Sequence, residues 1–303
     1  MMHGPSADAP PDLLLIGAAT RDLQPDGGWR LGGTVVFAAL TAARLGLRAA
    51  IVTSGPPDVL RALAAAAPEV AVAAIPAPDA TTFENVYDAA GHRRQYLRGR
   101  AAPLTLDAVP VAWRAAPLVL LAPLAQEVDP ELPASLARGT QSRLAATPQG
   151  WLRQWDASGL VRTGAWESAA RVLPALSALI LSWEDLVAPD ALPGDEASHR
   201  AEEWLRAWSQ MVPFVVITRG ARGADLLTST GCERFPAYPV RQVDPTGAGD
   251  VFAAAFLCAL HASGDPRRAM DFANCAASLA VKGEGTAGIP TRAQVERRQR
   301  LSS

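Results

Sequence analysis

The segment with the clearest capacity for chemistry is Asp244-Pro-Thr-Gly-Ala-Gly-Asp250, which follows a β-prone run and leads directly into an apolar helical pattern. Phe252, Phe256 and Leu260 recur four residues apart in that pattern, so a helix is expected to begin at the Gly-Ala-Gly turn. The first amides of a helix have no partners within it and lie at the positive end of the helix dipole. The sequence therefore predicts an anion site at this turn.

An aspartate directly beside that anion site needs an explanation, because a carboxylate repels the anion that the amides attract. Asp250 is such a residue. Both features have a purpose if Asp250 takes a proton from a hydroxyl that attacks phosphorus. The amides of Gly247, Ala248 and Gly249 would then hold charge on the transferred phosphoryl group. The alternative is a glycine-rich helix start in which Asp250 only interacts with the helix dipole.

The elements that must position these residues alternate along the chain in an α/β manner. Short apolar runs bounded by turn residues are separated by longer alanine-rich helical segments, which is typical of a mostly parallel sheet with crossover helices. A helix is expected at 34–45, and short strands at 223–229, 232–236 and 240–243 are expected to add an antiparallel edge. The main strands are expected at 13–17, 49–53, 70–75, 118–122, 143–147, 178–182 and 214–218.

Two regions break that alternation. β-prone runs at 81–87 and 93–97 flank a loop of hairpin length, and residues 18–33 contain a second turn at Asp26-Gly27-Gly28. These runs suggest a small antiparallel flap; the alternative is an antiparallel edge on the main sheet. No internal repeat or linker divides the chain, so we expect one domain at 12–298, a disordered tail at 1–11 and a short tail at 299–303.

Composition narrows the class of partner. The chain has 303 residues, 28 basic and 30 acidic, so it has no overall field that would gather nucleic acid or an anionic membrane. Its three cysteines are far apart and form no Cys-x-x-Cys pair, and no apolar run reaches the roughly 20 residues of a membrane span. We therefore expect a soluble, cytoplasmic protein that binds a small molecule and contacts neither nucleic acid nor membrane.

The run Asp-Pro-Thr-Gly-Ala-Gly-Asp-Val-Phe at 244–252 resembles the C-terminal signature of the ribokinase-like sugar kinases, the PfkB family. In that family the last aspartate of the signature is the catalytic base and the Gly-Ala-Gly amides form the anion hole. The resemblance implies an α/β fold, a three-layer α/β/α sandwich with a small β-sheet lid. The lid would be built from about 18–33 and 81–100.

Further matches extend the resemblance over about residues 13–290. Gly32 and Gly33 are similar to the family's N-terminal glycine pair, and Asp22 matches its substrate-binding aspartate. The turn Thr218-Arg-Gly-Ala-Arg-Gly223 resembles the turn beside the nucleotide. The resemblance therefore implies that residues of the glycine segment and the lid bind the substrate. It also implies that the nucleotide is bound by this turn and by the segment 273–277, which falls where the family has the helix beside the adenine. The nucleotide-binding candidates are Thr218, Gly220, Gly223 and Asn274, and the lid candidates for substrate binding are Glu84 and Arg98.

Two positions depart from the family's pattern. Phe37 stands where the family usually has an asparagine that binds sugar hydroxyls, which puts an ordinary ribose-like or nucleoside substrate in doubt. Ser182-Trp-Glu-Asp185 stands where the family has an Asn-x-x-Glu motif associated with magnesium. Asp185 is the matching acid, one methylene shorter, and the resemblance implies that it binds Mg²⁺. The alternative for this acid is an ordinary helix cap.

The resemblance implies an ATP-dependent kinase that transfers the γ-phosphate to a hydroxyl of a sugar, sugar acid or polyol. One alternative is a nucleoside kinase of the same family, in which Phe37 would stack on a base. Another is a non-catalytic sugar or nucleotide sensor derived from such a kinase, although a sensor has no use for the base Asp250. The expected partners are the acceptor, ATP and Mg²⁺, and the resemblance also implies a homodimer formed through exposed lid strands.

Overall fold

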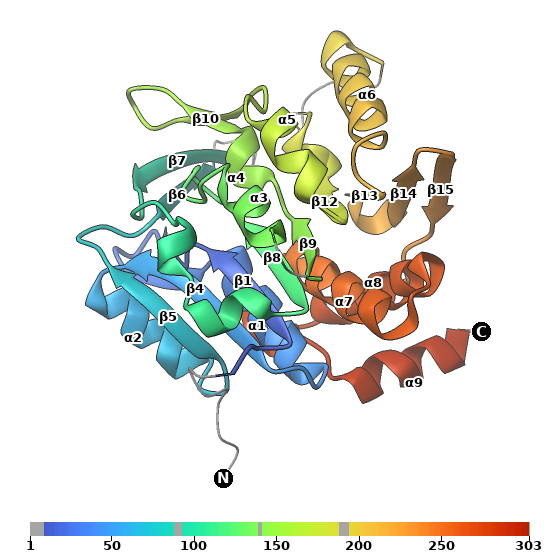
Figure 1. The fold of residues 1–303 in the computed structure, drawn as a ribbon, viewed down its shortest axis with the longest axis horizontal. Coiled ribbons are helices and arrows are strands. Elements are labelled where there is room, and N and C mark those ends of the chain that lie inside the picture. Colours follow the sequence, from blue (N-terminus) through green and yellow to red (C-terminus); the bar gives the residue numbers. More distant parts are fainter. Residues whose placement is uncertain (1–8, 88–92, 139–140, 188–193, 303) are drawn as a thin grey trace.

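The computed structural model describes residues 9–87, 93–138, 141–187 and 194–302. Within them, a central sheet of nine strands has the order β15-β14-β13-β12-β9-β8-β1-β4-β5 (Figure 1). The strands from β13 to β5 pair in parallel, and β14 and β15 add an antiparallel edge. The bounds are β1 Leu13–Gly17, β4 Ala49–Gly55, β5 Ala71–Pro76, β8 Leu118–Ala122, β9 Arg143–Ala146, β12 Ala178–Ser182, β13 Phe214–Thr218, β14 Ala224–Thr228 and β15 Gly231–Phe235. The seven predicted parallel strands and two of the three antiparallel ones are therefore present.

The predicted strand at 240–243 is wrong. Prolines at 236, 239 and 245 lack amide donors, so this segment cannot supply a regular ladder beside β15. The amides of Val243 and Asp244 instead donate to the carbonyl of Val281, at 2.8 and 3.2 Å. The segment therefore crosses the end of helix α8 (Pro266–Ala280) on its way to α7 (Ala248–Ser263).

Helices cover both faces of the central sheet, because its strands bury both faces. In β1, Leu13 and Leu15 pack on one side while Leu14 and Ile16 pack on the other, and all four are fully buried. The first side holds α1 (Thr34–Arg44), α2 (Pro57–Ala66), α7, α8 and α9 (Arg292–Ser302). The second holds α3 (Leu132–Ala137), α5 (Ala169–Val172) and α6 (Glu196–Trp208). The predicted three-layer α/β/α sandwich is confirmed.

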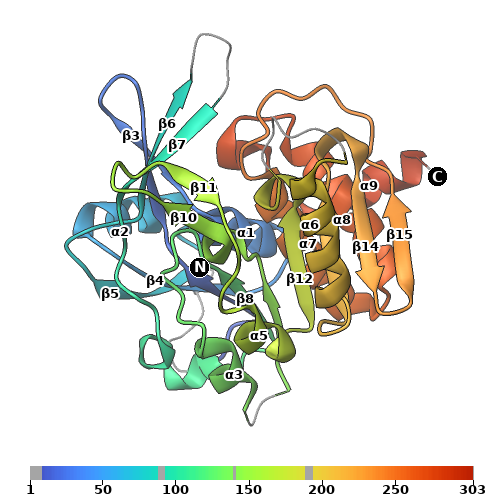
Figure 2. The same ribbon diagram turned by 90° about the horizontal axis from the view of Figure 1, so that it is seen from above.

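The two regions that broke the alternation form a separate small sheet. It contains β2 (Thr20–Leu23), β3 (Trp29–Gly32), β6 (Thr82–Tyr87) and β7 (Arg93–Gly99) in the order β3-β2-β6-β7. Figure 2 shows β3, β6 and β7 standing out from the body of the molecule. Each hairpin is antiparallel as expected, but the two hairpins join through a parallel β2–β6 pair. The loop at 88–92 lies outside the described residues.

A hairpin that the sequence did not predict continues this small sheet. Strands β10 (Arg153–Trp155) and β11 (Val161–Thr163) pair antiparallel, and an isolated bridge joins Tyr96 of β7 to Leu160. The amide of Leu97 donates to the carbonyl of Gly159 at 2.8 Å. Strands of three residues are too short for a period-2 pattern to be recognised.

The remaining helical elements are short connections. Helix α4 spans Gln149–Leu152 and leads directly into β10. None of the helices in the described part of the chain combines the length and apolar character that a membrane span requires. The 3₁₀ turns are η1 Leu106–Ala108, η2 Val111–Ala115, η3 Leu173–Ala175, η4 Trp183–Asp185, η5 Gly220–Arg222 and η6 Gly285–Gly288.

Candidate active site

Helix α7 begins at the predicted turn and leaves amides available there. Gly247 is its N-cap in the left-handed conformation, with φ 76°. The amide of Ala248 donates to the carbonyl of Pro245 at 3.2 Å, so it is already engaged. No acceptor for the amides of Gly249 and Asp250 lies among the residues that the structure describes. These two unpaired donors at the positive end of a 16-residue helix form an anion-binding site.

Phe37 lies beneath that turn. A Cβ atom added to Gly247 would stand 2.1 Å from Cδ1 of the Phe37 ring, which leaves no room for a side chain. The positive φ of Gly247 is a second reason why this position requires glycine. Phe37 is 5% exposed, and most of its surface is therefore used in packing. The structure gives Phe37 a role in supporting the anion site that the sequence did not predict, and its contact with a substrate stays a prediction.

Asp250 is partly buried in the first turn of α7, and charged groups from other elements surround it. Burial raises the pKa of its carboxyl to about 6, while a hydrogen bond from Thr34 at the start of α1 opposes that shift. The carboxylates of Asp185 and Asp22 also raise the pKa, and the guanidinium of Arg153 lowers it. The structure thus brings four ionisable side chains together, and the pKa suits a general base at neutral pH.

Asp22 lies on β2 beside the glycine pair, as the resemblance implies. Thr20 Oγ1 donates to Asp22 Oδ1 at 3.1 Å. A Cβ atom on Gly32 would stand 2.3 Å from Asp22 Oδ2, so the absence of a side chain there makes room for the carboxylate. Gly33 has φ 103°, and its Cβ would stand 2.4 Å from the carbonyl of Ala18. The small sheet and the start of α1 therefore hold Asp22 in place on the side of Asp250.

Asp185 closes a capping box at the end of β12. Its Oδ2 accepts from the amide of Ser182 at 2.8 Å, while Ser182 Oγ accepts from the amide of Glu184 at 3.3 Å. Its Oδ1 accepts from Gln149 Nε2 at 2.7 Å. The cap that the sequence offered as an alternative is thus present.

Asp185 can serve as one magnesium contact at most. No group of three or more metal-ligating side chains occurs among the described residues. Mg²⁺ commonly binds one or two carboxylates and takes its other oxygens from phosphates and water. Asp185 fits that limited part, because a carboxylate that accepts two hydrogen bonds still has lone pairs.

The turn after β13 lies next to the β12 end that leads to Asp185, because β12 and β13 are neighbouring strands. Ser182 and Thr218 are register partners at the ends of the parallel strands β12 and β13. Gly220 and Gly223 have φ 57° and 89°, and the carbonyl of Gly223 accepts from the amide of Arg219 at 2.7 Å. The turn therefore lies at the carboxyl edge of the sheet, where ligands bind in open α/β folds.

The other predicted ligand-binding side chains have partners within the protein. Asn274 is 6% exposed, and its Nδ2 donates to the carbonyl of Phe235 at 3.4 Å. Glu84 and Arg98 form an ion pair across the β6–β7 hairpin, at 2.7 Å between Oε2 and Nε. Arg98 Nη1 also donates to the carbonyl of Ser158 at 3.0 Å. Nucleotide binding by Asn274 and substrate binding by this pair stay predictions.

Sequence reasoning missed three polar residues near the site. Glu127 is fully buried and accepts hydrogen bonds from the amides of Ala18 and Leu124, which fixes the loop after β8 to the loop after β1. Gln149 contacts Asp185, and Arg153 acts on Asp250. A glutamate soon after a fully apolar strand was a usable signal, because such a strand ends at the ligand-binding edge.

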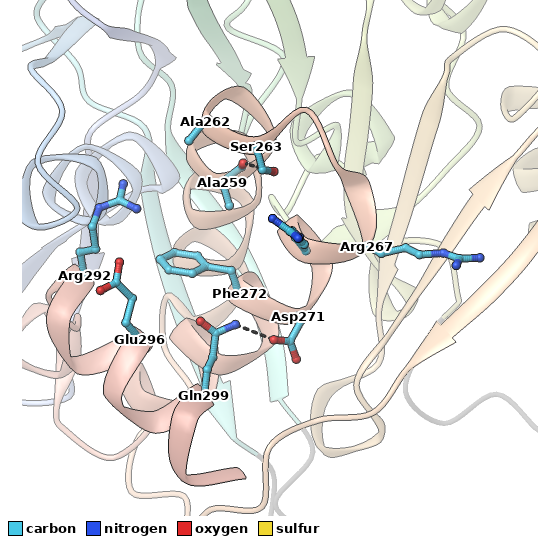
Figure 3. A pocket seen from close by; sticks show the side chains of 10 residues that line it. Ala259, Ala262, Ser263, Arg267, Asp271, Phe272, Arg292, Glu296 and Gln299 are labelled. Carbon is cyan, nitrogen blue, oxygen red and sulfur yellow. Dashed lines mark hydrogen bonds between the residues drawn. The ribbon is translucent and has the colours of Figure 1, made fainter. Parts of the chain in front are cut away.

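A surface depression of about 490 Å³ lies elsewhere, between the C-terminal end of α7, the first turns of α8 and helix α9 (Figure 3). The side chains of Phe272, Arg292 and Glu296 line it, together with residues at the C-terminal end of α7. An α-helix rises 1.5 Å per residue, so Ser263 at that end is about 20 Å from Gly249. The depression is therefore separate from the carboxylates around Asp250.

Comparison with known proteins agrees with the motifs. Residues 162–292 match the model of the pfkB family carbohydrate kinases. The ribokinase of Bacillus subtilis is 46% identical over 81 residues, which cover 26% of this chain and 28% of that protein. The ATP-dependent ribose-1-phosphate kinase of Halopiger xanaduensis is 39% identical over 78 residues, 26% of each chain. The chain thus aligns with only about a quarter of the length of these curated relatives.

Solved structures match over nearly the whole chain. A pyrophosphate-dependent kinase in the ribokinase family, complexed with a pyrophosphate analog and myo-inositol, has a TM-score of 0.76 at 21% identity. That match covers 94% of this chain and 99% of the other. The Arabidopsis thaliana ribokinase complexed with ribose and ATP has a TM-score of 0.71 at 19% identity, with coverage of 95% and 98%. The predicted ribokinase-like fold is confirmed.

Proposed function

We propose that this chain, which belongs to the PfkB family of ribokinase-like carbohydrate kinases, is an ATP-dependent kinase for a hydroxyl of a sugar, sugar acid or polyol. The observation that carries the proposal is the position of Asp250. A carboxylate with a pKa of about 6 lies in the same helical turn as two unpaired amides, and the carboxylate of Asp22 on the small sheet helps to raise that pKa. A base and an anion site in one turn suit transfer of a phosphoryl group to an alcohol.

The proposed step conserves atoms and charge. Asp22 binds the acceptor, and Asp250 accepts the proton of the attacking hydroxyl. The hydroxyl oxygen forms a bond to the γ-phosphorus while the bond from that phosphorus to the bridging oxygen breaks, and the electron pair leaves with ADP. The amides of Gly249 and Asp250 donate to the oxygens of the moving phosphoryl group. Asp250 then releases the proton to solvent.

Asp185 would be the side chain that holds magnesium, which when bound would neutralise part of the charge of the donor phosphates. The protein would assist this binding by fixing the orientation of the Asp185 carboxylate. That carboxylate is fixed by the amide of Ser182 and the side chain of Gln149. The turn from Thr218 to Gly223 lies beside it and would contact the donor on the same side.

Two alternatives remain within this proposal. A nucleoside acceptor is disfavoured because Phe37 is packed under Gly247 and has little surface left to stack on a base. A non-catalytic sensor is disfavoured because the site retains a base with a raised pKa. The donor is proposed to be ATP, and inorganic pyrophosphate is the other donor to test, since it is the donor of a kinase with the same fold.

The test is a matrix of donors against acceptors. ATP and pyrophosphate, each with Mg²⁺, are combined with sugars, sugar acids, polyols and nucleosides, and formation of the phosphorylated acceptor is followed. We expect ATP to support transfer to a carbohydrate or polyol. Transfer only to nucleosides, or only from pyrophosphate, would contradict the corresponding part of the proposal. Absence of transfer to every acceptor would favour a sensor.

Asp250→Asn is the matched variant for this assay. It keeps the size of the side chain but removes its capacity to accept a proton, so turnover should fall by about 10²- to 10⁴-fold. ATP affinity should hold, and the melting temperature at neutral pH should not fall below that of wild type, because the amides are unchanged and the variant no longer buries an ionised carboxylate. A variant that keeps more than about a tenth of the wild-type turnover would require another base.

We further propose a cytoplasmic location and a homodimer. The three cysteines are free thiols, two of them buried, which suits a reducing compartment. Dimerisation is proposed through the small sheet, which has an edge strand. The formal charge of -2 gives no reason to propose nucleic acid or membrane as a partner.

A further inference from the structure

The segment Gln149–Arg153 lies between the two sides of the candidate site, and its backbone is tightly held. The amide of Gly150 donates to the carbonyl of Pro123 at 2.8 Å. A Cβ atom on Gly150 would stand 2.3 Å from the amide nitrogen of Leu124, so only glycine permits this approach. Trp151 Nε1 donates to the carbonyl of Val128 at 3.0 Å. Helix α4 is therefore fixed against the loop that follows β8.

The first side chain of the segment points to the donor side. Gln149 Nε2 donates to Asp185 Oδ1 at 2.7 Å. Asp185 is also held by the amide of Ser182, so Gln149 completes the orientation of that carboxylate. One end of the segment is thus attached to the residue proposed to contact magnesium.

The last side chain of the segment points to the acceptor side. Arg153 Nη1 donates to the carbonyl of Leu124 at 3.1 Å, and its guanidinium lies 4.9 Å from the ring centroid of Phe83. Phe83 on β6 is the register partner of Asp22 on β2, so their side chains leave the small sheet on the same face. The guanidinium therefore lies close to the aspartate proposed to bind the acceptor.

The charge of Arg153 also reaches the proposed base. Its guanidinium lowers the pKa of Asp250, which burial and two neighbouring carboxylates raise. The carbonyl of Arg153 accepts from Gln126 Nε2 at 2.8 Å, so the strand that carries the side chain is fixed as well. Arg153 is thus a partly buried cation, held from two directions, beside the place where donor and acceptor would meet.

On the basis of the proposed kinase function, we propose that Arg153 is a further catalytic residue, whose guanidinium donates to the phosphoryl oxygens from the acceptor side during transfer. The amides of Gly249 and Asp250 act from the donor side, so the moving group would be held between them. Arg153 makes and breaks no covalent bond; it stabilises charge on the transferred group, as guanidinium groups do in other phosphoryl transfers.

The variant for the test is Arg153→Met, and the chain offers a matched control. Methionine keeps much of the aliphatic stem that packs near Phe83 and removes the charge. Arg100 makes contacts of the same kind with the same loop: its Nε and Nη2 donate to the carbonyls of Ala125 and Gln126 at 2.8 and 2.7 Å. Its guanidinium lies 5.8 Å from the Trp155 ring. Arg100→Met therefore removes comparable structural contacts, and Arg100 is not among the groups that shift the pKa of Asp250.

We expect Arg153→Met to lower kcat at least about 100-fold while KM for donor and acceptor changes by less than about threefold, because the lost interaction belongs to the transition state. Arg153→Lys should recover part of kcat, and Arg100→Met should keep kcat within about threefold of wild type. An Arg153→Met enzyme with a raised acceptor KM and an unchanged kcat would overturn the proposal in favour of ground-state binding. Equal losses in both Met variants would overturn it in favour of a structural role.

A second readout needs neither donor nor acceptor. The titration of the Asp250 carboxyl can be followed by NMR of carboxyl-labelled protein, with Asp250→Asn assigning the signal. Loss of the Arg153 charge should move its midpoint upward, and Arg100→Met should leave it in place. An unmoved midpoint overturns the inference about Arg153 even when the kinase assay succeeds. A wild-type protein that transfers no phosphoryl group overturns the proposed function instead, whatever the titration shows.

Discussion

Asp250 combines burial with three charged neighbours, and this combination makes the proposed activity dependent on pH. Its carboxyl must be ionised to accept a proton, and its pKa is raised to about 6. We therefore expect kcat to fall as the pH drops through about 6, with a slope of one proton. A pH profile of kcat at saturating donor and acceptor checks this. An acid limb near pH 4, the ordinary range of an aspartate, would contradict the assignment.

The same pKa shift makes the stability of the folded chain depend on pH. Between about pH 4 and pH 6 the unfolded chain has released the proton of Asp250 and the folded chain has kept it. Folding is therefore favoured by this group at low pH, and its contribution is lost as the pH rises through about 6. Asp250→Asn lacks the titration, so the melting temperature of the variant relative to wild type should rise over that interval. A constant difference would show that Asp250 does not titrate there.

Gly247 is the second residue whose substitution gives a sharp prediction. Gly247→Ala should lower both stability and turnover, because alanine there combines a φ of 76° with a Cβ atom 2.1 Å from the Phe37 ring. Gly264→Ala is the matched control. Gly264 caps the other end of α7 with φ 68°, and no atom lies within 4 Å of its added Cβ.

The control should therefore lose only the cost of left-handed backbone, about 1 to 2 kcal/mol, and retain its turnover. Thermal unfolding and kcat are measured for both variants. The loss of stability and turnover in Gly247→Ala beyond that in Gly264→Ala then measures the effect of the contact with Phe37. Equal effects in the two variants would mean that Phe37 does not support the anion site.

The role of a residue could be predicted when the groups with which it acts lie close to it along the chain. Asp250 and its amides could be recognised because turn, helix start and carboxylate fall within seven consecutive residues. Arg153 could not, because its position depends on Leu124 and Phe83, which belong to other elements. The role of Phe37 under Gly247 likewise depends on the packing of α1 against α7, and no local pattern reports such a contact.

At the scale of elements, strands buried on both faces were the easiest to predict. β1 and β8 are fully buried, uninterrupted apolar runs bounded by turn residues. The segment 240–243 has a valine at each end but two polar residues between them, and its flanking prolines prevent a regular ladder. The amides of Val243 and Asp244 bond the carbonyl of Val281 at the end of α8 instead. The β10–β11 hairpin was missed because three-residue strands depend on the neighbouring β7 for their pairing.

The small sheet should be the element that responds to substrate. Its apolar contacts with the body are a small cluster in which Phe83, Leu124 and Ala125 are buried, and the half-buried Trp29 and Leu31, which pack against the first main core. These contacts are far fewer than those within the two main cores. Elements with few buried contacts open at low free energy, and a bound ligand reduces that opening. Amide exchange in peptides covering β6 and β7 should therefore slow when acceptor and a non-hydrolysable ATP analogue are added. Peptides from α6 serve as the control.

Exchange that slows equally in α6 would indicate a general stabilisation by ligand, and exchange unchanged in β6 and β7 would indicate a fixed sheet. The distinction matters for the proposed chemistry, because Asp22 is carried by the small sheet, whereas Asp250 lies on helix α7, which packs against the central sheet. If exchange in the small sheet did not change, Asp22 would have to bind the acceptor from a sheet whose local opening is unaffected by the ligand.

At the scale of the whole molecule, the two edges of the small sheet differ. The β7 edge is partly covered, because Tyr96 and Leu97 pair with Leu160 and Gly159. The opposite edge, β3, has no strand beside it among the described residues. An uncovered edge presents unpaired backbone donors and acceptors that can pair with another chain. The proposed homodimer should therefore form through β3 of each copy.

Light scattering should then give a molar mass of about double the 31.8 kDa of one chain. Amide exchange in the peptide containing Trp29–Gly32 should speed up on dilution, since separating the copies exposes that edge. The central sheet provides the comparison, because β15, a strand of five residues, lies at one of its edges. Protection that depends on concentration at β15 rather than β3 would assign the contact to the central sheet, and a mass of one chain at all concentrations would exclude the dimer. Pairing through β3 would directly join the two sheets that are proposed to bind the acceptor, because Asp22 lies on β2, the strand beside β3.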